Sequence, residues 1–116
     1  GSEMCIRDRV EEAAVNVPNL GFIDCLPNKI VVEVPAKLDK TGVHGTKLNN
    51  YPKGFGNLLN SQVGVIEMTT EAILKKSKHD AYLALLADPV VDNAINAEKL
   101  LNNMIGTQEE FLGYLN

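Results

Sequence analysis

Apolar and polar residues alternate along residues 28–38 (NKIVVEVPAKL). Ile30, Val32 and Val34 occupy every second position, and a period of two predicts a β-strand with one side in the core. Val31 and Glu33 fall on the opposite side of this strand. Pro35 has no backbone donor, so we expect pairing of the strand to end there.

Turn residues follow this strand directly. The sequence DKTG, residues 39–42, suits a tight turn because Gly42 tolerates a positive φ and Asp39 can bond back to the chain. Residues 43–48 then return as a partner strand, and an earlier extended segment ends at Pro18. The first half therefore predicts an antiparallel β-hairpin unit.

Beyond residue 54 the apolar positions recur at steps of three and four. They are Phe55, Leu58, Leu59, Val63, Ile66, Thr70, Ile73 and Leu74. This spacing predicts an amphipathic helix of about five turns. Gly64 lies within it at a propensity cost of ~1 kcal/mol, which leads us to expect a closely packed neighbour at that point.

A second helix is predicted over residues 78–87. Ser77 can cap its N-terminus, because a serine side chain accepts from the first free backbone N–H groups. The Asp88-Pro89 pair should end it, since the residue before a proline is disfavoured in helical conformation.

Two further helices complete the pattern. Asn96 is the expected cap of a helix that Gly106 ends. Thr107 with Glu110 fits a capping box for a last short helix. The predicted fold class is therefore α+β, an antiparallel β hairpin unit followed by about four helices.

Composition excludes several classes of protein. The net charge is −4, and acids and bases are interspersed, so no basic stripe supports binding of nucleic acid. No apolar run reaches the ~18–20 residues that cross a bilayer, so no membrane association is expected. No pair of cysteines has metal-type spacing, which indicates a reducing, cytoplasmic setting.

The first nine residues, GSEMCIRDR, follow neither a helical nor a strand period. We interpret residues 1–9 as a non-native segment, of the kind that read-through of a sequencing adaptor produces. The native part would then be residues 10–116, the tail of a longer polypeptide that was cut off upstream.

Short catalytic and cofactor motifs do not occur in the chain, neither a dinucleotide fingerprint nor a phosphate loop or zinc helix. His44 and His79 are expected to be solvated, since neither has a companion ligand nearby. Cys25 is expected to be a small buried hydrophobe. Glu67 and Glu71 lie one helical turn apart and indicate a solvated helix edge.

Two blocks of sequence resemble the family 4 glycoside hydrolases. Residues 15–45 carry the elements V-N-x-P-N-x-G-x-I-x-x-L-P, V-V-E-V-P-A and D-x-x-G-x-H. Residues 58–92 carry N-x-Q-V, E-x-T-x-E-A and L-L-x-D-P in the same order. The resemblance covers nearly all of residues 10–116 and is nearest to the α-glucosidase and α-galactosidase branch. The VVEVPA and LLADP blocks disfavour a 2-hydroxy acid dehydrogenase of the same fold.

The resemblance implies a particular chemistry and architecture. Enzymes of this family hold NAD and a divalent metal, commonly manganese, and cleave O-glycosidic bonds of a small glycoside by oxidation, elimination, addition and reduction. The implied fold is that of lactate and malate dehydrogenases, a Rossmann domain followed by an α+β domain. This chain resembles only the C-terminal domain, so the NAD and metal sites would lie on a missing N-terminal domain. The fragment would be inactive and bind neither cofactor alone, with no catalytic or metal-ligating residue of its own, and the whole enzyme would be a homo-oligomer, a dimer or tetramer.

Three residues are candidates for the side that faces substrate or cofactor: Asn19, Gly21 and Glu33. Glu33 could instead face water on a half-exposed sheet. Asn19 offers donors and an acceptor to sugar hydroxyls, and Gly21 permits close backbone approach, but both equally suit a turn. The alternative for the whole chain is a non-catalytic oligomerisation or interaction domain of the same fold.

Overall fold

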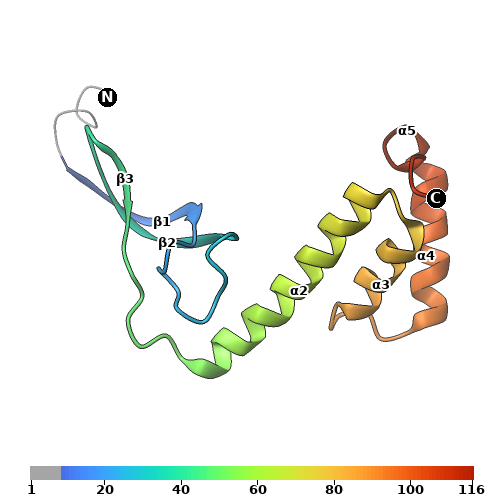
Figure 1. The fold of residues 1–116 in the computed structure, drawn as a ribbon, viewed down its shortest axis with the longest axis horizontal. Helices are drawn as coiled ribbons and strands as arrows, with labels where there is room; N and C mark the ends of the chain where they lie inside the picture. Colours follow the sequence, from blue (N-terminus) through green and yellow to red (C-terminus); the bar gives the residue numbers. More distant parts are fainter. Residues whose placement is uncertain (1–8) are drawn as a thin grey trace. The chain divides into compact units, whose positions relative to one another are not determined.

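The computed structural model describes residues 9–116, which form two compact units, one ending at Leu59 and the other beginning at Asn60. The elements, labelled in Figure 1, are β1 (Val10–Pro18), β2 (Val31–Asp39), β3 (Gly42–Gly45), α2 (Lys53–Lys75), α3 (Lys78–Ala87), α4 (Ala94–Thr107) and α5 (Glu109–Leu112). Strands precede helices throughout, which confirms the predicted α+β class. The boundary between the units falls inside α2.

The three strands form one antiparallel sheet in the order β1-β2-β3. Val32, Val34 and Ala36 are buried along one side of β2, whereas Val31 and Glu33 on the other side are exposed. Val34 is only 1% exposed and lies opposite Val15 of β1. The alternation seen in the sequence is therefore the alternation between core and solvent.

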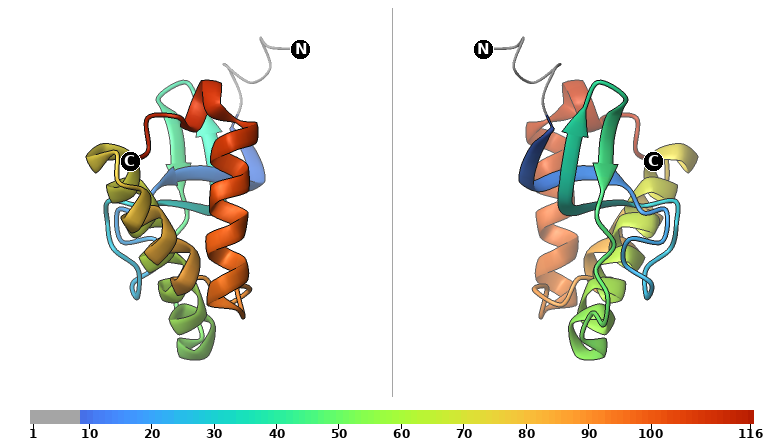
Figure 2. Two further views of the ribbon diagram at one scale, coloured as in Figure 1. Left: turned by 90° about the vertical axis from the view of Figure 1, so that its right-hand side faces the viewer. Right: turned by 90° about the vertical axis from the view of Figure 1, so that its left-hand side faces the viewer.

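The turn between β2 and β3 has the predicted chemistry. Gly42 has a φ of 124°, a backbone conformation that residues other than glycine rarely adopt. The Thr41 amide donates to Asp39 Oδ1 at 2.8 Å, so the carboxylate closes the turn from within. Figure 2 shows β2 and β3 side by side, joined by this turn.

The expectation that pairing ends at Pro35 is wrong for the β1 side. Pairing with β1 is irregular opposite Pro35, between Glu12 and Val15, and then resumes to Leu38. The Pro35 carbonyl accepts from the Thr46 amide at 2.8 Å, so the edge of Pro35 that lacks an N–H faces the segment after β3. No ladder bond to β1 is lost there, which is how β2 tolerates the proline.

The first two helices follow their predicted limits closely. The Asp80 amide donates to Ser77 Oγ at 3.0 Å, which confirms Ser77 as the N-cap of α3. Asp88 is the C-cap residue of the same helix, immediately before Pro89. Gly64 differs from expectation, since a Cβ there would meet no atom of the described residues within 4 Å.

The last two helices differ from the prediction at their ends. Asn93, not Asn96, is the N-cap of α4, because Asn93 Oδ1 accepts from the Asn96 amide at 3.0 Å. Gly106 lies inside α4 rather than after it. The Thr107 hydroxyl donates back to the Asn103 carbonyl at 3.0 Å, so it makes no capping box, and α5 begins without a side-chain cap.

No helix of the described residues is both long and apolar enough to cross a bilayer. The 23-residue α2 exceeds the others in length, and it carries exposed Glu67 and Glu71, as expected for a solvated edge.

Candidate functional site

The loop between β1 and β2 is organised by Asn19, whose side chain is fully buried. Asn19 Nδ2 donates to the carbonyls of Ile23 and Leu26, both at 3.0 Å, and of Pro27 at 3.1 Å. Asn19 Oδ1 accepts from the Ile23 amide at 2.9 Å. Every hydrogen-bonding group of the side-chain amide is thus bonded to backbone atoms of the loop, which supports the turn-forming role of this residue. A role toward substrate or cofactor stays a prediction.

Gly21 lies in the same loop, with a φ of 88°. A Cβ at this position would meet nothing within 4 Å among the described residues, so the space beside it is open. The conformation alone explains the glycine, because other residues are strained at such a φ. The open space leaves room for an approaching group, which is what the proposed cleft-side role requires.

The outward side of the sheet carries Glu33 and several other polar side chains. Glu33 lies opposite Asn16 of β1, and Lys37 lies opposite His44 of β3. Residues directly opposite each other on paired strands share a face, and all four are exposed. We call Asn16, Glu33, Lys37 and His44 the polar face. Val31, which is 65% exposed, lies on the same side of β2 as Glu33.

A cluster of three side chains closes the hairpin at one end of the polar face. His44 Nε2 lies 2.7 Å from Thr41 Oγ1 and 3.1 Å from Asp39 Oδ1, and the Thr41 hydroxyl also contacts Asp39 Oδ1. Sequence reasoning treated His44 as merely solvated and missed this cluster. The D-x-T-x-x-H spacing was its signal, because a tight turn brings positions 39, 41 and 44 together.

Hydrogen bonds from this cluster lower the pKa of Asp39 from 3.8 to about 2. The Thr41 hydroxyl contributes most, followed by the Thr41 amide and then His44. Each donor favours the charged carboxylate over the protonated acid. Asp39 is therefore ionised throughout the physiological range.

This shift predicts how the hairpin responds to acid. A carboxyl whose pKa is lowered by folding stabilises the fold fully above its unfolded pKa of ~3.9 and loses that contribution as the pH falls through the folded value. We expect the Thr41 amide resonance to titrate near pH 2. Thr41→Val should move the midpoint toward 3.8, whereas Thr46→Val should leave it in place. A midpoint near 3.8 in the unmodified chain would contradict the cluster.

Cys25 is exposed, so the expectation of a buried hydrophobe is wrong. Ile23 and Leu26 on either side of it fill the loop interior instead. The thiol lies over Gly56, where the Cβ of any larger residue would come within 2.5 Å of Cys25 Sγ. Gly56 thus has the close neighbour that was expected at Gly64.

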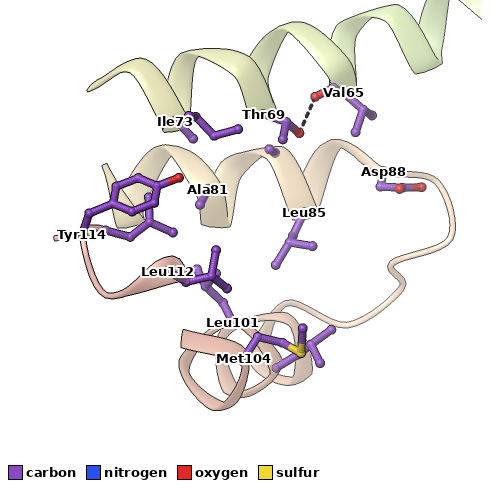
Figure 3. A pocket seen from close by; sticks show the side chains of 14 residues that line it. Val65, Thr69, Ile73, Ala81, Leu85, Asp88, Leu101, Met104, Leu112 and Tyr114 are labelled. Atoms are coloured by element: carbon purple, nitrogen blue, oxygen red, sulfur yellow. Dashed lines mark hydrogen bonds between the residues drawn. The ribbon is translucent and has the colours of Figure 1, made fainter. Parts of the chain in front are cut away.

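The helical unit contains an apolar pocket with a volume of about 610 Å³ (Figure 3). Val65 and Ile73 of α2, Leu85 of α3 and Met104 of α4 are among the side chains that line it. The Thr69 hydroxyl beside them is already bonded to the Val65 carbonyl at 2.8 Å. Asp88 and Tyr114 are the titratable side chains of this lining, which is otherwise mainly apolar packing surface.

Within residues 9–116, no three His, Cys, Asp or Glu side chains gather in a way that could hold a metal ion. His79 is exposed on α3, and the β unit has no glycine-rich loop leading from a strand into a helix. That the NAD and metal sites lie on another part of the polypeptide stays a prediction.

The structure is an α+β domain in which the buried side chain of Asn19 holds the loop between β1 and β2, and one face of the sheet is polar. Comparison with known proteins identifies its family, because the family 4 glycosyl hydrolase C-terminal domain matches residues 4–91. The α-glucosidase of Erwinia rhapontici is 45% identical over 105 residues, which cover 90% of this chain and 23% of that enzyme. The chain belongs to the family 4 glycosyl hydrolases, as the sequence motifs had indicated.

Solved structures show the same fold. The 6-phospho-β-glucosidase of Thermotoga maritima, with manganese, NAD+ and glucose-6-phosphate, superposes with a TM-score of 0.82 at 26% identity, over 93% of this chain and 27% of that one. A 6-phospho-α-glucosidase from gut microorganisms, with NAD and glucose-6-phosphate, gives 0.81 at 27% identity, over 99% and 25%. The chain thus spans about a quarter of the length of these relatives.

The family match begins at residue 4, inside the segment that we interpret as non-native. Residues 1–8 lie outside the described part of the chain, so the assignment of residues 1–9 stays a prediction. The structural likeness to the gut enzyme extends over the helices after residue 91, beyond the end of the family match.

Proposed function

We propose that this chain is the substrate-side part of a cytoplasmic glycosidase that depends on NAD and a divalent metal. The observation that carries the proposal is the 45% identity to an α-glucosidase across 90% of the chain. The proposed reaction is hydrolysis of an O-glycosidic bond through oxidation, elimination, addition and reduction, and an α-glucoside is the first substrate to test. Manganese is the metal of choice, because a related structure contains it.

The chain's own residues supply structure and a polar surface in this proposal. NAD and the metal would both be held by the rest of the polypeptide, a Rossmann domain. The polar face would border the cleft, with Glu33 as a hydrogen-bond acceptor for sugar hydroxyls. Gly21 would allow a second close approach beside it, and Asn19 would hold the loop in place.

A chimera tests the proposal. Residues 10–116 would replace the corresponding segment of the Erwinia rhapontici α-glucosidase, and hydrolysis of a chromogenic α-glucoside would be measured with and without NAD and Mn²⁺. We expect turnover that requires both additions, and none from the 116-residue chain alone. A chimera that unfolds cooperatively yet turns over nothing, beside an active parent enzyme, would contradict the proposal and favour a non-catalytic interaction domain.

Assembly is a separate part of the proposal. We propose a homo-oligomer, a dimer or tetramer, for the complete enzyme. Analytical ultracentrifugation of the chimera gives its mass directly, and a monomer that is fully active would remove this part alone.

A further inference from the structure

The hydrogen atoms of the hairpin cluster can be assigned from its contacts. An ionised Asp39 carboxylate only accepts hydrogen bonds. The Thr41 amide donates to Asp39 Oδ1 at 2.8 Å, and the Thr41 hydroxyl donates to the same oxygen. The single hydroxyl proton is used there, so toward His44 the Thr41 oxygen can only accept.

His44 Nε2 faces two acceptors as a result. It lies 2.7 Å from Thr41 Oγ1 and 3.1 Å from Asp39 Oδ1. Nε2 must therefore carry the hydrogen, and neutral His44 is held as the Nε2–H tautomer. The lone pair is then on Nδ1, which has no hydrogen-bond partner among residues 9–116.

The place of His44 makes Nδ1 accessible. Its side chain is 52% exposed, and it belongs to the same face as Glu33. The strand position opposite His44 is four residues from Glu33, or about 13 Å along β2. An imidazole oriented by a carboxylate through one nitrogen, with the other nitrogen open, is the arrangement in which histidines act as general bases.

We propose that His44 is a proton-transfer residue of the assembled enzyme and that Nδ1 is its reacting nitrogen. The inference rests on the proposed function. In the step, the O–H bond of a bound sugar hydroxyl breaks and an N–H bond forms at Nδ1. The oxygen keeps the electron pair, and Asp39 balances the positive charge on the imidazolium. The reverse transfer returns the proton.

Other charged groups near His44 define the setting of this transfer. Lys37 lies opposite His44 on β2, and Glu11 lies opposite Lys37 on β1. Lys40 occupies the turn, and Asp39 is the carboxylate in direct contact. Lys37 and Lys40 bring positive charge to this region and Asp39 and Glu11 bring negative charge, but only Asp39 is in direct contact with His44, so this is the contact that the test must remove.

The tautomer can be tested on the 116-residue chain itself. Long-range ¹H–¹⁵N correlation spectra at a pH where both histidines are neutral should show His44 Nδ1 as the unprotonated nitrogen. His79, exposed on α3, serves as the reference imidazole in the same spectrum. Asp39→Ala should return His44 to the pattern of His79. A His44 pattern equal to that of His79 in the unmodified chain would overturn the assignment.

The role in proton transfer is tested in the chimera. His44→Gln keeps an N–H donor for Asp39 and Thr41 but removes the proton acceptor. Since general acid–base catalysis contributes at least ~100-fold, we expect kcat/KM to fall about that much and its decline at acidic pH to disappear. His79→Gln should change neither. Unaltered kcat/KM and pH profile in a folded His44→Gln chimera would overturn this role, whereas an inactive unmodified chimera would instead contradict the proposed function.

Discussion

Replacing Asn19 with alanine is expected to lower the free energy of unfolding by about 2–4 kcal/mol, because buried groups left without a partner cost ~1–3 kcal/mol each. The two hydrogens of Asn19 Nδ2 are shared among three carbonyl oxygens, and Oδ1 accepts a hydrogen bond from the Ile23 amide. Alanine would remove all of these bonds, and of the four groups only the Ile23 carbonyl would keep another partner, the Leu26 amide at 3.2 Å. Urea unfolding of the 116-residue chain followed by circular dichroism measures the change.

Two variants make this measurement specific. Asn16→Ala removes the same side chain from an exposed position of β1 and should change stability by less than about 0.5 kcal/mol, as surface substitutions usually do. Asn19→Asp keeps the acceptor for Ile23 but loses the donors, so it should also destabilise the fold. An Asn19→Ala variant as stable as Asn16→Ala would mean that the loop does not depend on the buried amide.

The sheet could be predicted because its signals are local. Val32 and Val34 alternate with Glu33, and burial follows the same alternation. The turn needed only Gly42 and Asp39, whose conformational and hydrogen-bonding preferences act within the turn itself. Sequence reasoning succeeds where neighbouring residues alone decide the conformation.

The features that were predicted at the wrong residues depend on which of several similar residues the tertiary structure uses. Two asparagines, Asn93 and Asn96, could each cap α4, and the sequence offers no reason to prefer the earlier one. Gly64 and Gly56 are both helical glycines, but only Gly56 meets a close neighbour, through the fold of the preceding loop. Pro35 is tolerated because β3 has already ended beside it.

The candidate site was only partly predictable for a related reason. The alternation of apolar and polar residues along β2 predicted that Glu33 is on the exposed side, as observed. The partners of Asn19 are four to eight residues away, and they depend on the path of an irregular loop. The His44 cluster was accessible in principle, because the D-x-T-x-x-H spacing brings its three residues together within one turn, but His44 was assessed only for a companion metal ligand.

Turnover by a Glu33→Gln chimera tests the central claim, that the polar face borders the sugar, most directly. Because a hydrogen bond to a charged group contributes ~1.5–3 kcal/mol, or about tenfold to a hundredfold, we expect kcat/KM for an α-glucoside to fall within that range. Glu71→Gln, on the exposed edge of α2, is the matched control and should keep full activity. A folded Glu33→Gln chimera with the same kcat/KM as the Glu71→Gln chimera would contradict the claim and leave Glu33 as a solvent-facing residue.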